Sequence, residues 1–375
     1  MIEANGHKRK ITAIKVLIKA IKCPTPKNVK GFVGILSKKV LSNLKGVRLM
    51  RKKELEIPLR IRKLEAELKR LPESHPKYQE ISDEYGRRMS GYRGEQSLKY
   101  YLSFLKEKNY SIFHNLRLPD ISGEHFFEID LLLISPKFQL IIDAKNYRGE
   151  LYFDGKFDQL IQTYKDTKKP YHCPVGQITR HQLQLKRLLE TFKLPSPTIE
   201  TLVVFTNPNA IIDASKDFKH SHKVIKSPSF LSKIELFEKR NRQEILDKKQ
   251  LQKVSKLLLK KHTPHDHDIL AQFGIKEHEL IKGVRCPKCD FLPMTRNVRS
   301  WSCPSCHYSS SKPCYNSLNE YILLFGNTIT NRQLRDFFDI QSISTATNIL
   351  SSLNLECEGK YKDRKYIITE QSLKK

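Results

Sequence analysis

The sequence predicts a chain of the α/β (α+β) class, with a mixed sheet flanked by helices and two small modules after it. Two adjacent apolar runs, 127–134 and 138–145, are separated only by a Ser-Pro-Lys turn, which is typical of a buried hairpin. A third apolar run, 199–206, follows a segment with helical spacing, so strands and helices alternate. Two Cys-x2-Cys pairs near the C-terminus indicate a separate module held by a metal.

The first 49 residues form a predicted basic extension, 1–49. Residues 1–50 contain 12 Lys or Arg and one acid, Glu3, so they carry +11 of the chain's net charge of +28. Lysines interrupt the apolar positions, so the segment lacks the continuous apolar core of a signal peptide. A basic amphipathic helix and a flexible basic arm are both compatible with this pattern. Met50 precedes a segment of ordinary charge balance and is an alternative start of translation.

Residues 50–90 are predicted to be an amphipathic helical segment that packs on the domain after it, 91–230. Between Pro58 and Leu71 the apolar residues follow helical spacing and alternate with Glu and Lys. A further helix is expected to open at Gly91. Glu95 stands three residues before the apolar Leu98, so its carboxylate shares the inward face of that helix.

Two carboxylates and a lysine interrupt the predicted hairpin. If its turn centres on Pro136 and Lys137, Asp130 lies directly opposite Asp143, and Lys145 follows on the same face. Like charges that face each other destabilise a sheet, and a buried carboxylate is costly unless it is paired or bound to a metal. An Asp-x-Lys triplet is common on protein surfaces, but its position inside apolar strands favours a cation site.

These residues occur in an order that resembles the nuclease-related domain (NERD) family over roughly residues 86–210. The matching elements are Gly94-Glu95, Ile129-Asp130, Asp143-Ala144-Lys145 and Pro174-Val175-Gly176-Gln177. That family is regarded as a branch of the PD-(D/E)xK nuclease fold, so the resemblance implies a restriction-endonuclease-like sheet. It also implies site roles for Glu95, Asp130, Asp143 and Lys145, with Gln177 as an accessory residue. Many members have Glu at the position of Asp143, and either residue can ligate a metal.

The residue types also fit phosphodiester hydrolysis. An oxygen-ligated Mg²⁺ or Mn²⁺ polarises the phosphoryl group and lowers the pKa of an attacking water. We expect Asp130 and Asp143 to be direct ligands, and Glu95 to bind directly or through water. Lys145 is expected to orient the nucleophile or to stabilise charge on the phosphate. For Gln177 a hydrogen bond at the helix start is an equal alternative, and His181 is expected to be structural.

Residues 231–282 are predicted to be a helical linker. His262, His265 and His267 lie there beside two aspartates, and a solvated run is favoured over a metal site.

A zinc ribbon is predicted at 283–312. Cys286, Cys289, Cys303 and Cys306 supply four thiolates with the spacing of a structural Zn²⁺ site, which leaves no open position for chemistry. Arg296, Arg299 and Trp301 lie between the two pairs, and phosphate contact with base stacking is one expectation. Trp301 as the core of the ribbon is the other.

A winged-helix-like domain is predicted at 313–375. Helical patterns at 318–325, 331–338 and 342–353 precede strand-like pieces at 355–358 and 366–369. The basic tip between the strands holds four cations, Lys360, Lys362, Arg364 and Lys365. In a winged helix the third helix enters the major groove and the wing contacts the backbone. A small docking domain is the alternative.

The net charge of +28 and the pI of about 9.7 indicate a polyanionic partner, with nucleic acid, and DNA in particular, favoured. No apolar stretch approaches the roughly 20 residues that cross a bilayer, and we expect a cytoplasmic protein. The predicted function is metal-dependent hydrolysis of DNA, in defence or DNA processing. A non-catalytic DNA-binding or regulatory protein that keeps the nuclease fold is the main alternative, and an RNA-processing factor is a weaker one.

Overall fold

The computed structural model describes residues 51–105, 110–298, 300–311, 315–360, 363–369 and 372–373. The predicted basic extension, 1–49, lies outside the described residues, as do Met50, Arg299 and Lys362. Within the described ranges, no helix combines the length and the apolar character that crossing a membrane requires.

Two helices precede the main sheet. Helix α3 (Leu59–Leu68) begins after Pro58 and buries Ile61 and Leu64, which confirms the predicted amphipathic helix. Helix α4 (Tyr78–Leu102) begins well before Gly91, where the sequence predicts its start. Its first half is polar and carries little amphipathic signal, and tertiary packing stabilises it. The buried Ile81 of this half joins a cluster with Leu64 of α3.

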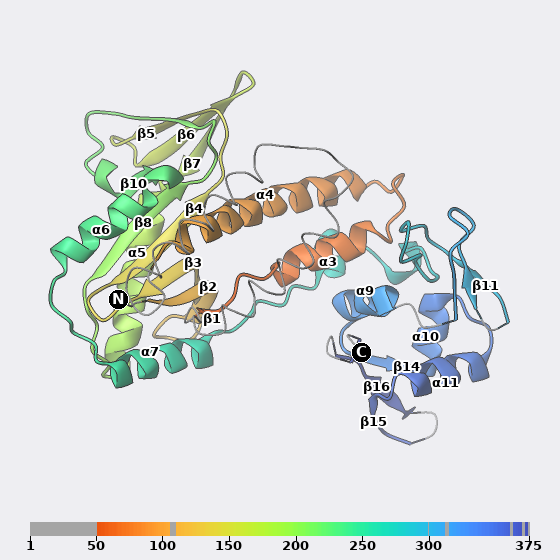
Figure 1. The fold of residues 1–375 in the computed structure, drawn as a ribbon. Coiled ribbons are helices and arrows are strands. Elements are labelled where there is room, and N and C mark those ends of the chain that lie inside the picture. Colours follow the sequence, from red (N-terminus) through yellow and green to blue (C-terminus); the bar gives the residue numbers. More distant parts are fainter. Residues whose placement is uncertain are drawn as a thin grey trace, which may run out of the picture. The chain divides into compact units, whose positions relative to one another are not determined.

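The main sheet has six strands in the order β1-β2-β3-β4-β8-β10 (Figure 1). Their bounds are β1 Arg51–Lys53, β2 Ser111–Pro119, β3 Phe126–Ile134, β4 Gln139–Lys145, β8 Ile199–Phe205 and β10 Val224–Lys226. Strand β3 pairs antiparallel with both β2 and β4, whereas the β1–β2, β4–β8 and β8–β10 pairs are parallel. The sheet is therefore mixed, as expected from the sequence.

The hairpin of β3 and β4 has the predicted register. Leu131 pairs with Ile142 and Ile134 with Gln139, and the Ser135 amide donates to the Phe138 carbonyl at 2.9 Å. Nearly all of the residues from Leu131 to Asp143 are buried, which explains why both strands read as continuous apolar runs.

Helices cover this sheet. Helix α5 (Pro174–Thr191) packs against β3, β4 and β8. Helices α6 (Phe230–Arg240) and α7 (Lys248–Lys261) lie in the stretch predicted to be a linker, yet both pack against the sheet. The Phe237 ring of α6 lies 6.1 Å from the Phe138 ring, and α7 contacts β1 and β2. Their buried apolar faces make them part of the sheet's packing rather than a free connector.

A second sheet of four strands was not predicted. It has the order β7-β6-β5-β9, with β5 Glu150–Asp154, β6 Gln159–Tyr164, β7 Thr167–His172 and β9 Ile211–Ala214. Leu151, Phe153 and Leu160 from this sheet share a core with Val175 and Ile178 of α5. The second sheet thus supports the start of α5. The 3₁₀ turns at Ser221–Lys223, Ser227–Ser229 and Glu277–Glu279 and the short helix α8 (Ile269–Phe273) lie among the connections that follow.

The described residues from Gly283 onward, here called the C-terminal module, contain two small sheets and three helices. Strands β11 (Thr295–Arg296), β12 (Trp301–Ser302) and β13 (Ser309–Ser310) form the first sheet. The second part runs α9 (Tyr315–Phe325), β14 (Thr328–Thr330), α10 (Asn331–Phe338), α11 (Ile343–Ser352), β15 (Glu356–Glu358) and β16 (Lys365–Ile367). The three predicted helices are confirmed, and the Ser342 hydroxyl caps α11 by accepting from the Thr345 amide at 3.2 Å.

The two parts of the C-terminal module share one core. Trp301 and Cys303 from the first part join a cluster with Leu318, Phe338 and Leu350 from the second. The ribbon and the helical part are therefore not independently packed, although the sequence predicts them as separate domains.

Two arginines and a glutamate are buried where α3 meets the C-terminal module. The Arg70 Nε donates to one oxygen of Glu320 and the Arg285 Nε to the other, each at 2.7 Å. The Arg70 guanidinium also lies 3.8 Å from the centre of the Phe337 ring and donates to the Ile281 and Gly283 carbonyls. Because every charge in this triad has a partner, its burial does not leave an isolated ion.

Candidate functional site

Asp130 lies where the hairpin ladder ends. The register would place it opposite Asp143, but the pairing of the two strands ends one position earlier, at Leu131 and Ile142. The Asp130 Oδ2 instead accepts from the Ala144 amide at 2.9 Å. The carboxylate of Asp130 therefore contacts the backbone between Asp143 and Lys145.

Lys145 is held by acceptors from two elements. Its Nζ lies 3.0 Å from the Oδ1 and 2.9 Å from the Oδ2 of Asp143, and 3.3 Å from the Oε1 of Gln177. Pro174 occupies the first turn of α5, where a missing amide hydrogen costs nothing, and this start brings Gln177 to Lys145. His181, one turn further along, packs its ring 5.9 Å from Phe127. Burial and the nearby Arg180 lower the pKa of His181 to about 4, so it is a neutral packing residue.

Glu95 is brought to the site by a close approach of α4 to the strand ends. A Cβ added to Gly94 would lie 2.8 Å from the Asn146 Cβ and 2.8 Å from the Thr206 Oγ1. Only glycine fits this approach without a shift. Asn146 also donates to the Ser90 carbonyl at 2.9 Å, which ties the end of β4 to the same helix.

Burial and nearby negative charges raise the pKa of the site carboxylates. Burial and the charge of Asp130 raise the pKa of Glu95 to about 9, against a hydrogen bond from Asn115. Burial and the charge of Asp143 raise the pKa of Asp130 to about 7, and burial raises that of Asp143 against the attraction of Lys145. Burial lowers the pKa of Lys145, but attraction to Asp143 and Asp130 outweighs it and the net direction is upward. The three carboxyl groups therefore do not all ionise readily beside Lys145 alone, and a bound cation would favour their charged forms.

A divalent cation fits this donor set. The Oε2 of Glu95 is buried without a hydrogen-bond partner among the described residues, and carboxylate oxygens are the ligands that Mg²⁺ and Mn²⁺ prefer. Of the described side chains, only the four ribbon cysteines form a group of three or more ligands whose atoms all lie within 4.8 Å. A single ion would therefore reach all three carboxylates only through water or after a side-chain rotation. Mg²⁺ commonly keeps several waters and binds one or two carboxylates.

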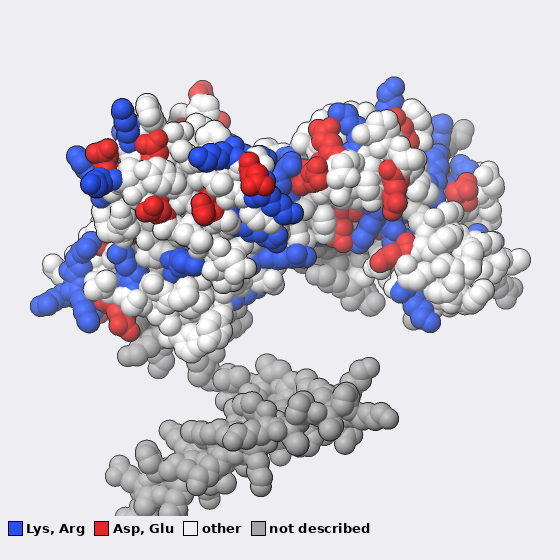
Figure 2. Space-filling view, turned by 90° about the horizontal axis from the view of Figure 1, so that it is seen from above, with Lys and Arg blue, Asp and Glu red and all other residues white. Residues whose placement is uncertain are grey.

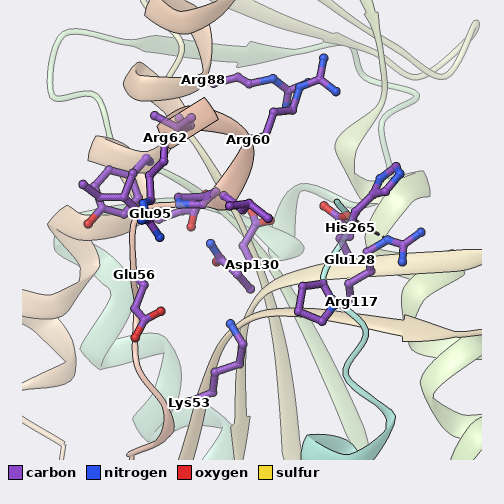
Figure 3. Close-up of a pocket in the computed structure, with 18 of the residues that line it drawn as sticks. Lys53, Glu56, Arg60, Arg62, Arg88, Glu95, Arg117, Glu128, Asp130 and His265 are labelled. Atoms are coloured by element: carbon purple, nitrogen blue, oxygen red, sulfur yellow. Dashed lines mark ion pairs between the residues drawn. The ribbon is translucent and has the colours of Figure 1, made fainter. Parts of the chain in front are cut away.

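A cavity of about 480 Å³ opens beside Glu95 and Asp130. In Figure 3, Asp130 lies between Lys53 on one side and Arg60 and Arg88 on the other. Further lining residues come from β2 and from the segment after α7, namely Asn115, Arg117, His262, His265 and His267.

Most of this wall was not predicted from the sequence. The three histidines were expected to form a solvated run, and the arginines carry no motif. Asn115 did carry a signal, because it is a polar residue between the buried apolar residues Phe113 and Leu116 of β2. It adopts a positive φ of 50° there, which asparagine tolerates better than most residues.

The four predicted zinc ligands converge. The Sγ atoms of Cys286, Cys289, Cys303 and Cys306 all lie within 4.8 Å of one another, and the four could hold a zinc ion. None of the four forms a disulfide. Trp301 is buried and packs edge-on against Phe338, so base stacking by Trp301 is wrong and the core alternative holds. Arg296 lies over the Trp301 ring, 5.0 Å from its centre.

The other predicted nucleic-acid-binding residues are at the surface. Lys360, Arg364 and Lys365 are exposed around the connection between β15 and β16, while Lys362 of the same tip lies outside the described residues. Figure 2 shows Lys and Arg side chains spread over one face of the chain, with Asp and Glu between them.

Comparison with known proteins bears on the middle of the chain. No curated protein and no solved structure matches it significantly. A family model described as the nuclease-related domain (NERD) matches residues 90–206. The matched range contains Glu95, Asp130, Asp143, Lys145 and Gln177, and it ends before α6 and the C-terminal module. Residues 90–206 therefore match a nuclease-related domain, and the match suggests a nuclease-related function.

Proposed function

We propose that this chain hydrolyses phosphodiester bonds of DNA in a metal-dependent reaction, and that its main sheet has the PD-(D/E)xK fold. One observation carries the proposal: the half-buried carboxylates of Glu95 and Asp130 and the buried carboxylate of Asp143 gather beside Lys145, and burial raises the pKa of all three. Such an arrangement is unfavourable in a purely structural site and is common where charge is needed for chemistry.

Asp130, Asp143 and Glu95 would hold a Mg²⁺ or Mn²⁺ ion, which when bound polarises a phosphoryl oxygen and lowers the pKa of a water. Lys145 is fixed by Asp143 and Gln177, so its ammonium can meet the negative charge that develops on the phosphate without reorganising. Glu95 presents an unpaired oxygen that can orient a water by hydrogen bonding. Gln177 acts as a positioning residue. Among the described residues its side chain hydrogen-bonds Lys145 and none of the three site carboxylates.

The C-terminal module would supply DNA binding. Its second part has the element order of a winged helix, with α11 in the place of the helix that enters the major groove. Lys360, Lys362, Arg364 and Lys365 would contact the backbone as the wing, and Arg296 and Arg299 would contact phosphates from the ribbon. Zinc bound by the four cysteines would hold the ribbon in shape.

The test is cleavage by the purified full chain with Mg²⁺ or Mn²⁺ on a panel of single-stranded, duplex and branched DNA and RNA. Asp143→Ala and Lys145→Ala should each lower the rate by about 10² to 10³. Both should leave DNA affinity nearly unchanged, because dispersed Lys and Arg supply most of it. Glu80→Ala is the control, since Glu80 forms an exposed ion pair with Lys77 and has no described contact with a site residue.

Wild-type protein that binds DNA tightly, cuts nothing with either metal and behaves like Asp143→Ala would instead support a non-catalytic DNA-binding protein. Cleavage of RNA but not of DNA would contradict the proposal that DNA is the substrate.

A further inference from the structure

The cavity beside Glu95 and Asp130 has walls that the family match does not explain. Lys53 of β1, Arg60 and Arg62 of α3 and Arg88 of α4 precede the matched range, and the segment from His262 to His267 follows it. The cavity is therefore built largely by the parts of this chain that flank the nuclease-related domain.

One wall carries uncompensated positive charge. Glu84 alone pairs with three guanidinium groups, at 3.2 Å from Arg60 and 2.9 Å from Arg87, and through the Nε of Arg88. Although burial raises it, hydrogen bonds from Arg88 and Arg87 lower the pKa of Glu84 to about 2, so this carboxylate stays charged. Only Arg60 and Arg88 of these three line the cavity, so one negative charge faces two lining guanidinium groups, and the excess suits a phosphate. The Arg60 Nε is buried and has no partner among the described residues.

Two histidine rings line another side of the cavity. The His265 ring is exposed and lies 3.6 Å from the His267 ring, measured between centres. The His267 Nδ1 lies 2.9 Å from Arg60, and burial and that positive charge lower the pKa of His267 to about 4. His267 is therefore neutral and can accept from Arg60. The acids Glu56 and Glu128 also line the cavity, and Glu128 is paired with Arg117 at 3.4 Å.

The size of the cavity restricts what can enter. A volume of about 480 Å³ is that of a site for one small ligand, and a double helix with grooves of about 6 and 12 Å cannot enter it. A single nucleotide of an unpaired strand can, with its phosphate toward the arginines and its base against the histidine ring, since bases stack on flat rings.

We propose that this cavity is a subsite for one unpaired nucleotide next to the scissile phosphate, with Arg60 and Arg88 facing the phosphate and His265 facing the base. The inference rests on the proposed function, because the subsite matters only if the adjoining carboxylates cut. It assigns the substrate class: strands that are single-stranded or locally unpaired, rather than intact duplex.

The first test measures binding in EDTA, where cleavage cannot occur. The probe is a fluorescent oligothymidylate of about six nucleotides, followed by anisotropy. Arg88→Gln should weaken its binding by about tenfold, the value of one charged hydrogen bond. Arg87→Gln is the matched control, because it removes the same charge and the same Glu84 partner one residue earlier, but Arg87 does not line the cavity. A blunt duplex should bind Arg87→Gln and Arg88→Gln equally.

The subsite would be overturned if Arg87→Gln and Arg88→Gln lost equal affinity for the single strand. It would also be overturned if the two variants differed in affinity for the duplex as much as for the single strand. His265→Ala gives a second measurement. This variant should bind the oligothymidylate more weakly than wild type does, but should bind an abasic strand of the same length equally well. Equal weakening of both strands would remove His265 from the proposal.

Cleavage with Mg²⁺ or Mn²⁺ separates this inference from the proposed function. If wild type cuts nothing while Arg88→Gln still differs from Arg87→Gln in binding, the nuclease proposal fails and the cavity stands as a nucleotide-binding site without cleavage. If it cuts duplex and single strand equally well and both arginine variants behave alike, the subsite fails and the nuclease proposal stands.

Discussion

Replacing Gly94 by alanine should move the one carboxylate that comes from a helix. The added Cβ would meet the Asn146 Cβ and the Thr206 Oγ1 at 2.8 Å each. Neither atom is the far end of a flexible side chain, so α4 or the strand ends must shift. Overpacking of this kind typically costs about 1 to 3 kcal/mol.

Gly86 offers a matched control in the same helix. A Cβ there meets nothing within 4 Å, so Gly86→Ala should only gain helix propensity and stabilise the protein by about 0.5 to 1 kcal/mol. The same gain applies to Gly94→Ala, so the difference between the two variants isolates the packing term. Gly94→Ala should therefore be less stable than Gly86→Ala by about 1 to 3 kcal/mol in urea unfolding.

Catalysis should follow the geometry. Because Glu95 is the next residue, a shift of α4 moves it from Asp130, and a misplacement of about 1 Å can cost about 10²-fold in rate. Gly86→Ala should retain wild-type cleavage. If Gly94→Ala matched Gly86→Ala in both stability and rate, the close approach of α4 would not position Glu95 and the reasoning would be refuted.

Three further predictions concern buried groups. Both oxygens of Glu67 are buried without a hydrogen-bond partner among the described residues, and burial with the charge of Asp268 raises its pKa from 4.5 to about 8. The folded state therefore keeps a proton on Glu67 that the unfolded state loses, so Glu67 should lower stability as pH rises from about 4.5 to 8, by at most about 1.4 kcal/mol per pH unit. The urea midpoint of Glu67→Gln should fall less over this range than that of wild type. Zinc removal or Cys289→Ser should unfold the C-terminal module, and the fluorescence emission of Trp301, the single tryptophan, should shift to the red. The circular dichroism of the main sheet should remain. Elemental analysis that finds no zinc in the native protein would count against this prediction. Glu320→Gln should destabilise by about 3 to 5 kcal/mol in urea unfolding, because Arg70 and Arg285 keep buried charges without a counter-charge, whereas Glu80→Gln in an exposed pair should change stability by less than about 1 kcal/mol.

The sequence predicts the local features of this protein well. The predicted pairing of Ser135 with Phe138 is confirmed, and α10 spans the predicted Asn331–Phe338. Both depend on neighbouring residues: a turn sets the register of a hairpin, and apolar spacing sets a helix. The metal and catalytic roles of the site residues remain predictions.

Features that depend on distant residues escaped prediction. Arg70 meets Glu320 across 250 positions, and nothing near either residue distinguishes it from an exposed charge. The first half of α4 is stabilised by packing and not by its own apolar spacing, so the sequence predicts the start of this helix too late in the chain. The cavity wall escaped for the same reason, because Lys53, Arg88 and His265 come together only in the folded chain.

The buried triad of Arg70, Glu320 and Arg285 bears on how such a chain can be cut or recombined. A protein ending near residue 312 would lack Glu320 and would leave two guanidinium groups at a newly exposed apolar surface that includes Leu64 and Leu71 of the cluster beside them. Lost DNA affinity in that protein would be inseparable from lost folding, so substitutions at Lys360 and Arg364 test the tail more cleanly than its removal. The same ion pair constrains related chains. A chain with a different C-terminal module would have to change Arg70 as well, so the residue at this position should indicate which C-terminal module a related chain has.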